Sequence, residues 1–376
     1  MRYCTKCLMP DTKPHIVFDS EGVCSACRTH EKKRDNVKGI NWDARAAEFD
    51  KLVQWALAQK APVYDAVVPV SGGKDSITQV HRLLKLNCNL RILAINIDYG
   101  VKTEIGRYNL DLIPKNLGAN LMIFRPEQKL HVKLIRIGLE DFGDPDLLSH
   151  TLLHAYPLRV AAGLNVPLFL HGENSAFEYG GDKDIADNNV FTRAWFQKYA
   201  ANNGKDALFI SEKYGIPFEQ LRQYDYPDEA DPAKTKAVFS SYFFHWDSEE
   251  HLKIANGYGF KSLDAPREGT YRTYVGIDEK INRLHQYLKV LKFGYGRASD
   301  HACEDIRNGR LTREEAKKLV RKHDLEELGQ DFIEDICKYL GYTESEFKGL
   351  LEKFRNTSIW QRDAKGSWFI PAHLEG

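Results

Sequence analysis

The sequence of 376 residues has no long apolar segment and no net charge. No apolar run approaches the roughly 20 residues that cross a bilayer, so we expect no membrane insertion. The first ten residues, MRYCTKCLMP, lack an apolar signal core, and we expect a cytoplasmic protein. Lys and Arg total 53, as do Asp and Glu, and this balance makes nucleic acid an improbable partner. With 43% hydrophobic and 28% charged residues, the chain has the composition of a soluble protein of about two domains.

The cysteine pattern excludes a disulfide framework and favours a metal site. Seven cysteines are an odd number for a compartment that we expect to be reducing. Four of them form two Cys-x-x-Cys pairs, Cys4 with Cys7 and Cys24 with Cys27. Two such pairs provide the tetrahedral thiolate shell of a structural Zn²⁺ ion, with no coordination position left open for catalysis. Unrelated buried thiols, an iron–sulfur cluster and a redox pair are the alternatives that the spacing leaves open.

Strand and helix patterns alternate in the middle of the chain. This alternation predicts an α/β fold with a doubly wound parallel sheet and helices on both faces. Ligands of such sheets bind at the carboxyl ends of the strands, which here carry SGGKDS, DYG and HGEN. The expected strands are AVVPV, RILAINIDYG, NLMIFRP, VPLFLHGEN and, later, YFFHW at 242–246; the expected helices cover 42–59, 74–87, 103–117, two stretches within 127–163, and 277–293.

The SGGKDS segment has the features of a phosphate-binding loop. Gly72 and Gly73 allow close backbone approach and positive φ, and the helix that follows offers unpaired N–H groups and the positive end of its dipole. Ser71, Lys74 and Ser76 add donors for phosphate oxygens. The spacing is not that of the Walker motif, which has four residues between its glycines.

Ser-Gly-Gly-Lys-Asp-Ser after a first strand resembles the pyrophosphate loop of the N-type ATP pyrophosphatases, the PP-loop superfamily with the adenine nucleotide alpha hydrolase-like fold. The resemblance implies that an oxygen of the substrate attacks the α-phosphorus of ATP and that pyrophosphate leaves. It also implies that Asp75 lies near Mg²⁺ and that Asp98 and Tyr99 hold adenosine. The loop residues that would bind ATP are Ser71, Gly72, Gly73, Lys74, Asp75 and Ser76.

Motifs along most of the chain point to a narrower family. YCTKCLMPDTKP with VCSAC, SGGKDS, HGENSAFEYGG and LKFGYGRASDHACEDIRNGRLTREEA together resemble the bacterial N-acetyl sugar amidotransferases, from Tyr3 to about Leu350. These enzymes act in surface-polysaccharide or flagellin-glycan pathways. The resemblance implies that ATP adenylates an acetamido oxygen of a nucleotide-linked sugar or nonulosonic acid, that ammonia adds, and that AMP leaves an acetamidino group. Lys74, Asp75 and Glu173 are the catalytic residues that we expect.

The source of ammonia is not evident in the sequence. No nucleophile-elbow cysteine and no second α/β pattern follow residue 260. The resemblance therefore implies a separate glutaminase subunit as partner. The alternative is that free ammonium suffices.

Further candidates lie after the fourth strand and near residue 295. We expect His171, Gly172, Glu173 and Asn174 at the active-site edge, with Gly172 beside the nucleotide. Glycines at 294 and 296 end a helix and expose a group of polar residues. A cationic pair in this group would hold phosphate or a sugar carboxylate. The alternative is that the lysine only lies near the negative end of the helix dipole at a helix C-cap. This pair is Lys292 with Arg297, next to Tyr295 and Asp300; Glu178, Asp182 and Asp184 are open between metal, sugar and solvent.

Two other functions are compatible with the loop. The tRNA sulfurtransferases also place four cysteines before it, but they use further cysteines close to the loop. The remaining cysteines here, Cys88, Cys303 and Cys337, are isolated, and we expect them to be core residues. An ATP-binding scaffold without turnover is the third possibility.

We divide the chain into three parts. Residues 1–40 form the zinc module, 41–260 the pyrophosphatase domain, and 261–376 a helical region that closes the active site. Thr312 with Glu315 and Thr343 with Glu346 have the spacing of capping boxes and predict helix starts. The tail from Trp360 has no assigned role.

Overall fold

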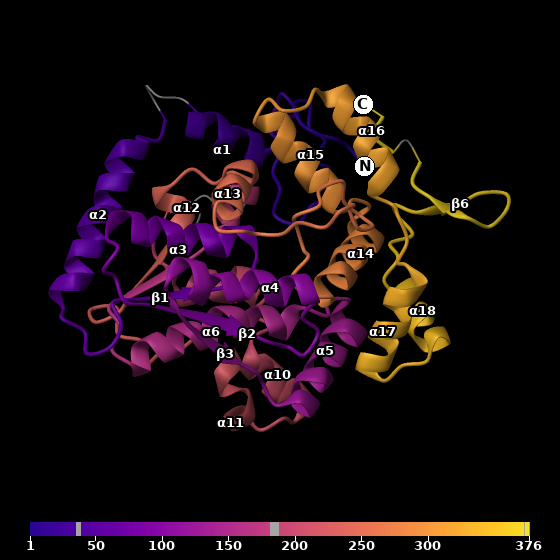
Figure 1. Ribbon diagram of the computed structural model, residues 1–376. Coiled ribbons are helices and arrows are strands. Elements are labelled where there is room, and N and C mark those ends of the chain that lie inside the picture. The colour runs from indigo at the N-terminus through magenta and orange to yellow at the C-terminus, as the bar shows by residue number, and fades with distance from the viewer. Residues whose placement is uncertain (35–38, 181–187, 372, 376) are drawn as a thin grey trace.

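The computed structural model describes residues 1–34, 39–180, 188–371 and 373–375 (Figure 1). Its centre is a five-stranded sheet in the order β3-β2-β1-β4-β5, and all neighbouring strands are parallel. The predicted doubly wound sheet is therefore confirmed. Because the chain runs outward in opposite directions from β1, the loops after β1 and β4 diverge and leave a crevice between them. The strands are β1 Ala66–Pro69, β2 Ile92–Ile97, β3 Asn120–Phe124, β4 Leu168–His171 and β5 Lys236–Phe239.

The central strands are buried on both faces. Every residue of β1, β2 and β4 is buried, as expected for parallel strands covered by helices on each side. Val68 points into one apolar core and Val67 into the other. α2 Trp42–Ala58, α3 Lys74–Leu86 and α4 Glu104–Leu112, which continues as a π turn Ile113–Leu117, contribute to the first core; α6 Leu147–Gly163 and part of α5 Gln128–Phe142 contribute to the second.

The fifth strand differs from the sequence prediction. The strand expected at Tyr242–Trp246 is wrong, because Ser240–Phe243 form the short helix α12 and the strand is Lys236–Phe239. Both segments bury aromatic rings, so the apolar pattern does not distinguish them; Phe243 packs 5.0 Å from Phe49, centroid to centroid. Among the described residues between β4 and residue 260, the other elements are α7 Ser175–Tyr179, α9 Arg193–Trp195, a π turn Phe196–Ala200, α10 Ala207–Tyr214, α11 Phe218–Leu221, a 3₁₀ turn Arg222–Tyr224 and α13 Ser248–Asn256.

The two ends of the chain pack against each other. The four-cysteine segment and α1 Ser25–Arg34 share one core with Tyr295, Val320 and Leu374 from the C-terminal region (Figure 1). Both capping boxes are present, and each starts a helix as expected. The tail forms a small antiparallel hairpin. The C-terminal elements are α14 Ile281–Phe293, α15 Arg297–Arg307, α16 Arg313–His323, α17 Gln330–Leu340, α18 Glu344–Lys353, β6 Gln361–Arg362 and β7 Trp368–Phe369.

The segment before α14 brings the C-terminal region to the edge of the sheet. Tyr274 and Ile277 belong to the core under α3 and α4, and Glu279 forms a bridge with Lys102. A Cβ at Gly106 would lie 2.3 Å from the carbonyl oxygen of Asp278, so the chain can pass here only over a glycine. In the part of the chain that the structure describes, no helix is long and apolar enough to span a membrane.

Candidate active site

The Ser71–Ser76 loop joins β1 to α3 and is shaped by its glycines. Gly72 has φ +91°, and a Cβ there would lie 2.8 Å from the carbonyl oxygen of Gly106. The Gly73 N–H donates to Ser71 Oγ at 3.1 Å, and the Ser76 hydroxyl donates to the Gly73 carbonyl oxygen at 2.8 Å. The loop thus presents backbone to the crevice at the start of a helix, which is an anion-binding arrangement.

An ion pair and a histidine fix the first turn of α3. Lys74 Nζ lies 2.8 Å from Asp75 Oδ2, and His251 Nδ1 of α13 lies 2.7 Å from Asp75 Oδ1. Desolvation opposes the charge of Asp75, but the Lys74 ammonium and the His251 hydrogen bond hold its pKa well below the usual range. Sequence reasoning missed His251, because it lies 176 residues away on a helix with no recognisable motif.

The carboxyl end of β2 supplies the next group. Asp98 is buried, accepts from the Gly100 N–H at 2.9 Å and pairs with Arg125. The Tyr99 hydroxyl donates to the Ser149 carbonyl oxygen at 2.8 Å. Lys102, a residue that sequence reasoning also missed, donates to the Ser71 carbonyl oxygen at 3.1 Å.

Glu173 follows β4 and lies beside the loop. Burial raises the pKa of this carboxyl to about 7, and the negative charge of Asp75 acts in the same direction. At neutral pH it is therefore poised to accept or release a proton. Gly172 lies close to Gln79 and Trp246, since an added Cβ would come within 3.0 Å of Gln79 Nε2.

Two neighbours of Glu173 are core residues, which corrects the expectation that they act at the site. The His171 ring stacks on Phe191, and its Nε2 lies 2.5 Å from His154 Nδ1. Burial lowers the pKa of His171 to about 3. Asn174 caps α7 and accepts from the Trp195 indole N–H at 2.9 Å. His171 shares with Phe169 the face of β4 that packs on the second core, whereas Glu173 lies beyond the end of the strand.

The cationic pair expected near residue 295 is split. Arg297 opens α15, bonds to Asn282 and faces the crevice. Lys292 points elsewhere, donating at 2.7 Å to the carbonyl oxygen of Gly143, the residue that ends α5. The structure therefore does not bring Lys292 together with Arg297, because Lys292 lies near the end of α14 and Arg297 opens the next helix.

The placed residues surround two adjoining cavities. The first cavity has about 310 Å³ and includes Ser71, Gly73, Lys74, Asp75, Asn96, Asp98, Tyr99, Lys102, Asp146, His150, Glu173, Tyr274, Asp278, Glu279, Asn282 and Arg297. The second cavity has about 440 Å³ and reaches α1 and α15. Eight residues line both cavities and form the junction between them: Lys74, Asp75, Asp146, His150, Glu173, Val275, Asn282 and Arg297.

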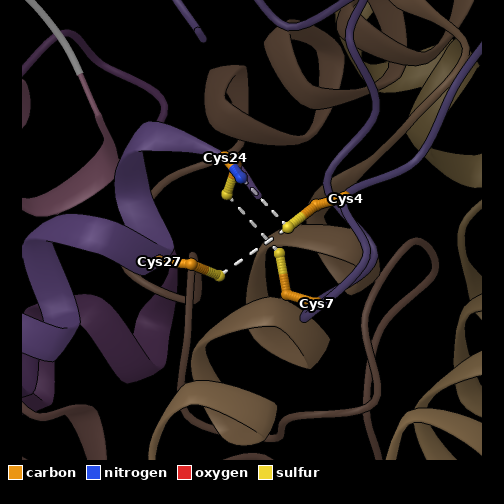
Figure 2. Close-up of side chains that lie close together, drawn as sticks. All are labelled: Cys4, Cys7, Cys24 and Cys27. Carbon is orange, nitrogen blue, oxygen red and sulfur yellow. Dashed lines mark hydrogen bonds between the residues drawn. The ribbon is translucent and has the colours of Figure 1, made fainter. Parts of the chain in front are cut away.

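The four cysteines converge at a separate point (Figure 2). Their Sγ atoms all lie within 4.8 Å of one another, with Cys4 to Cys27 at 3.9 Å and Cys7 to Cys24 at 3.7 Å. Thiolates bound tetrahedrally at about 2.3 Å from one ion would be about 3.8 Å apart. The donor set thus fits a single metal ion, whereas a cubic iron–sulfur cluster would hold its thiolates further apart.

The remaining candidates have mixed outcomes. Glu178 pairs with Lys33 of α1 at 2.5 Å, and both side chains are almost fully buried. Asp182 and Asp184 lie outside the described residues. Cys303 and Cys337 are buried as expected, whereas Cys88 is exposed at the far end of α3.

Comparison with known proteins finds a family match for the C-terminal part of the chain. Residues 268–373 match the family model "LPS biosynthesis protein WbpG-like, C-terminal domain". No curated protein matches the chain. The matching solved structures include the U34-tRNA thiolase NcsA from Methanococcus maripaludis with its [4Fe-4S] cluster, at 14% identity over 90% of this chain and 96% of that chain. The TM-score of this match is 0.32.

Proposed function

We propose that this protein is the ATP-dependent synthetase of an amidotransferase that converts an acetamido group of an N-acetyl sugar to an acetamidino group. One observation carries the proposal: a phosphate-binding loop and a carboxyl of raised pKa stand at the junction of two cavities, in a chain with a WbpG-like C-terminal region. Two cavities suit a reaction between two substrates. The setting would be surface-polysaccharide or flagellin-glycan synthesis in the cytoplasm.

ATP would occupy the first cavity. The Ser71–Ser76 backbone and the start of α3 would hold the pyrophosphate, and the ionised Asp75 would face its Mg²⁺ ion. The cavity extends along the end of β2, where Asp98 and Tyr99 would flank adenosine. Lys74 and Arg297 bring positive charge to the junction, where charge on the transferring phosphoryl group must be neutralised.

The reaction balances as two displacements. The acetamido oxygen attacks the α-phosphorus, forming a C–O–P linkage while the bond to pyrophosphate breaks. Ammonia then adds to the activated carbon, and the C–O bond to AMP breaks. The nitrogen that was added loses a proton, and Glu173 at the junction is placed to take it.

The four-cysteine site would hold structural Zn²⁺. Four thiolates around one tetrahedral ion saturate zinc, so no substrate position remains. Ammonia would come from a separate glutaminase subunit, with free ammonium as the simpler source. Nucleic acid has no role in this proposal.

The cysteine positions favour amidination over tRNA thiolation. α3 has 13 residues and begins at the loop, so Cys88 just beyond its end lies about 20 Å away. Cys303 is buried against the Leu8 N–H, and Cys337 is buried among the helices of the C-terminal region. None of the seven cysteines lines the first cavity, where a sulfur carrier would have to act.

A single incubation tests the proposal. The protein would receive ATP, Mg²⁺, an ammonium salt and a panel of free and nucleotide-linked N-acetyl sugars, with AMP and the sugar mass followed together. AMP formed in step with replacement of one oxygen by NH supports amidination. ATP binding without AMP would indicate a scaffold, and AMP release dependent on unmodified tRNA and a sulfur donor would indicate thiolation.

A further inference from the structure

The second cavity lies where three parts of the chain meet. Its wall includes His30 of α1, Tyr179 of α7, Gln286 of α14 and Arg307 of α15. It opens onto the first cavity at the residues of the junction, including Glu173. A molecule bound there would lie next to the position proposed for the ATP phosphates.

Several polar atoms in this wall have no hydrogen-bond partner. Among the described residues, ten buried side-chain N or O atoms are unpartnered, and four of them belong to residues that line the second cavity. Buried polar groups are normally hydrogen-bonded, so such a concentration needs a cause. A polar ligand that completes these bonds supplies one. The four atoms are His30 Nε2, Glu178 Oε1, Gln286 Oε1 and Arg307 Nη1.

Beyond the junction, each acidic side chain of the wall has a basic partner, and Glu304 is paired with Arg272. Lys33 pairs with Glu178, and Lys289 pairs with Asp300. In the described part of the chain, Arg307 and Lys13 take part in no ion pair within 4 Å, and both line the cavity. A guanidinium with free donors binds carboxylate or phosphate oxygens. The cavity is therefore suited to a polar ligand with an anionic group.

We propose that the second cavity is the acceptor site and that Arg307 binds an anionic group of the acceptor. This inference rests on the proposed function and extends it to the chemistry of the acceptor. Lys13 contributes a second positive charge, while His30 and Gln286 bond to uncharged polar groups. The anion is either a carboxylate on the sugar or the diphosphate of a nucleotide carrier, since Arg307 suits both.

The same geometry gives the four-cysteine site a role. His30 follows Cys27 by three residues on α1, so both side chains lie on one face of that helix. Arg34 of the same helix donates to the Arg307 carbonyl oxygen at 3.3 Å. A metal ion that fixes Cys27 thus also positions two walls of the acceptor site without touching the reacting atoms.

The test uses full-length, metal-loaded protein and the substitution Arg307→Gln. Isothermal titration would measure binding of UDP-N-acetylglucosamine and of the matching uronic acid, which differs by one carboxylate. Loss of a charge-assisted bond should weaken binding by about tenfold or more, with metal content and ATP affinity unchanged. Arg321→Gln, at an exposed position of α16, is the matched control.

The outcomes separate the two sources of the anion. Weaker binding of the uronic acid alone identifies the carboxylate, and weaker binding of both sugars identifies the diphosphate. The inference is overturned if Arg307→Gln binds both like the wild type, if the wild type binds neither, or if the variant loses its metal, which would make Arg307 a counter-ion of the thiolates. Failure of the proposed function is distinct, because it appears as wild-type protein that binds the sugar but forms no AMP or amidine.

Discussion

His251 Nδ1 lies 2.7 Å from Asp75 Oδ1 and so connects α13 to the first turn of α3. His251 is fully buried and its ring stands against Trp246 at 4.5 Å. The contact orients a carboxylate that would otherwise depend on Lys74 alone. It makes α13 part of the proposed nucleotide site, although α13 contributes no loop residue.

Removing this contact should impair the use of MgATP. We expect His251→Ala to lower kcat/KM for ATP by about tenfold, corresponding to about 1.4 kcal/mol of lost stabilisation. His251→Asn keeps a donor near the Nδ1 position and should recover part of that loss. Both substitutions remove the imidazole ring, but only His251→Ala also removes the donor. Thermal melting would show the stability that each variant loses with the ring, and the difference in kcat/KM between the variants would report the effect on Asp75. Equal kcat/KM values for the two variants would contradict the positioning role.

The pH profile should reflect Glu173. Its pKa is raised to about 7, so the carboxyl is protonated below that pH and ionised above it. If the ionised form accepts a proton, kcat/KM for the acceptor rises with pH and levels off above about 8. Glu173→Gln should lose this inflection and lower the rate by about 10²–10⁴-fold. A profile that keeps its inflection in the variant would assign it to another group.

The same shift predicts a change in stability with pH. A carboxyl whose folded pKa lies above its unfolded value stabilises the fold when protonated, and this contribution is lost as pH rises through about 7. The melting temperature of Glu173→Gln minus that of the wild type should therefore be larger at pH 8 than at pH 4.5. Melting curves at the two pH values would check the sign.

Local patterns predicted the fold and the loop, but not the contacts between distant segments. Each strand, and the SGGKDS loop, is a contiguous stretch of sequence. The apolar periodicity therefore predicts β1, β2 and β4, and the positions of the glycines predict the phosphate-binding loop. His251 and Lys102 act through packing that no spacing reveals. The contact of Lys292 was equally hidden, because the direction of a side chain around a helix depends on its tertiary neighbour, here the end of α5. The sequence pattern predicted the fifth strand at YFFHW and not at Lys236–Phe239, because both segments bury aromatic side chains.

Gly72 should tolerate no side chain. A Cβ would meet the Gly106 carbonyl oxygen at 2.8 Å, and φ is +91°. We expect Gly72→Ala to abolish ATP binding and to cost about 1–3 kcal/mol of stability. Gly118→Ala is the matched control, since φ is +77° but nothing lies within 4 Å of the added Cβ. Titration with ATP and chemical denaturation would compare them, and similar losses in both would show that backbone strain alone is responsible.

Removal of the metal should unfold the N-terminal segment and loosen the C-terminal helices. Cys4, Cys7, Cys24 and Cys27 are buried in the same core as Val320 of α16, so an ion bound there would stabilise both ends of the chain. Metal binding to such sites contributes about 10 kcal/mol or more to folding, and loss of one thiolate sacrifices much of it. We expect Cys27→Ser to reduce bound zinc, measured by atomic emission, and to lower the melting temperature, whereas Cys88→Ser should do neither because Cys88 is exposed and remote. Hydrogen exchange would show whether protection falls in α1 and α16 together. Loss confined to α1 would mean that the C-terminal helices hold their shape without the ion.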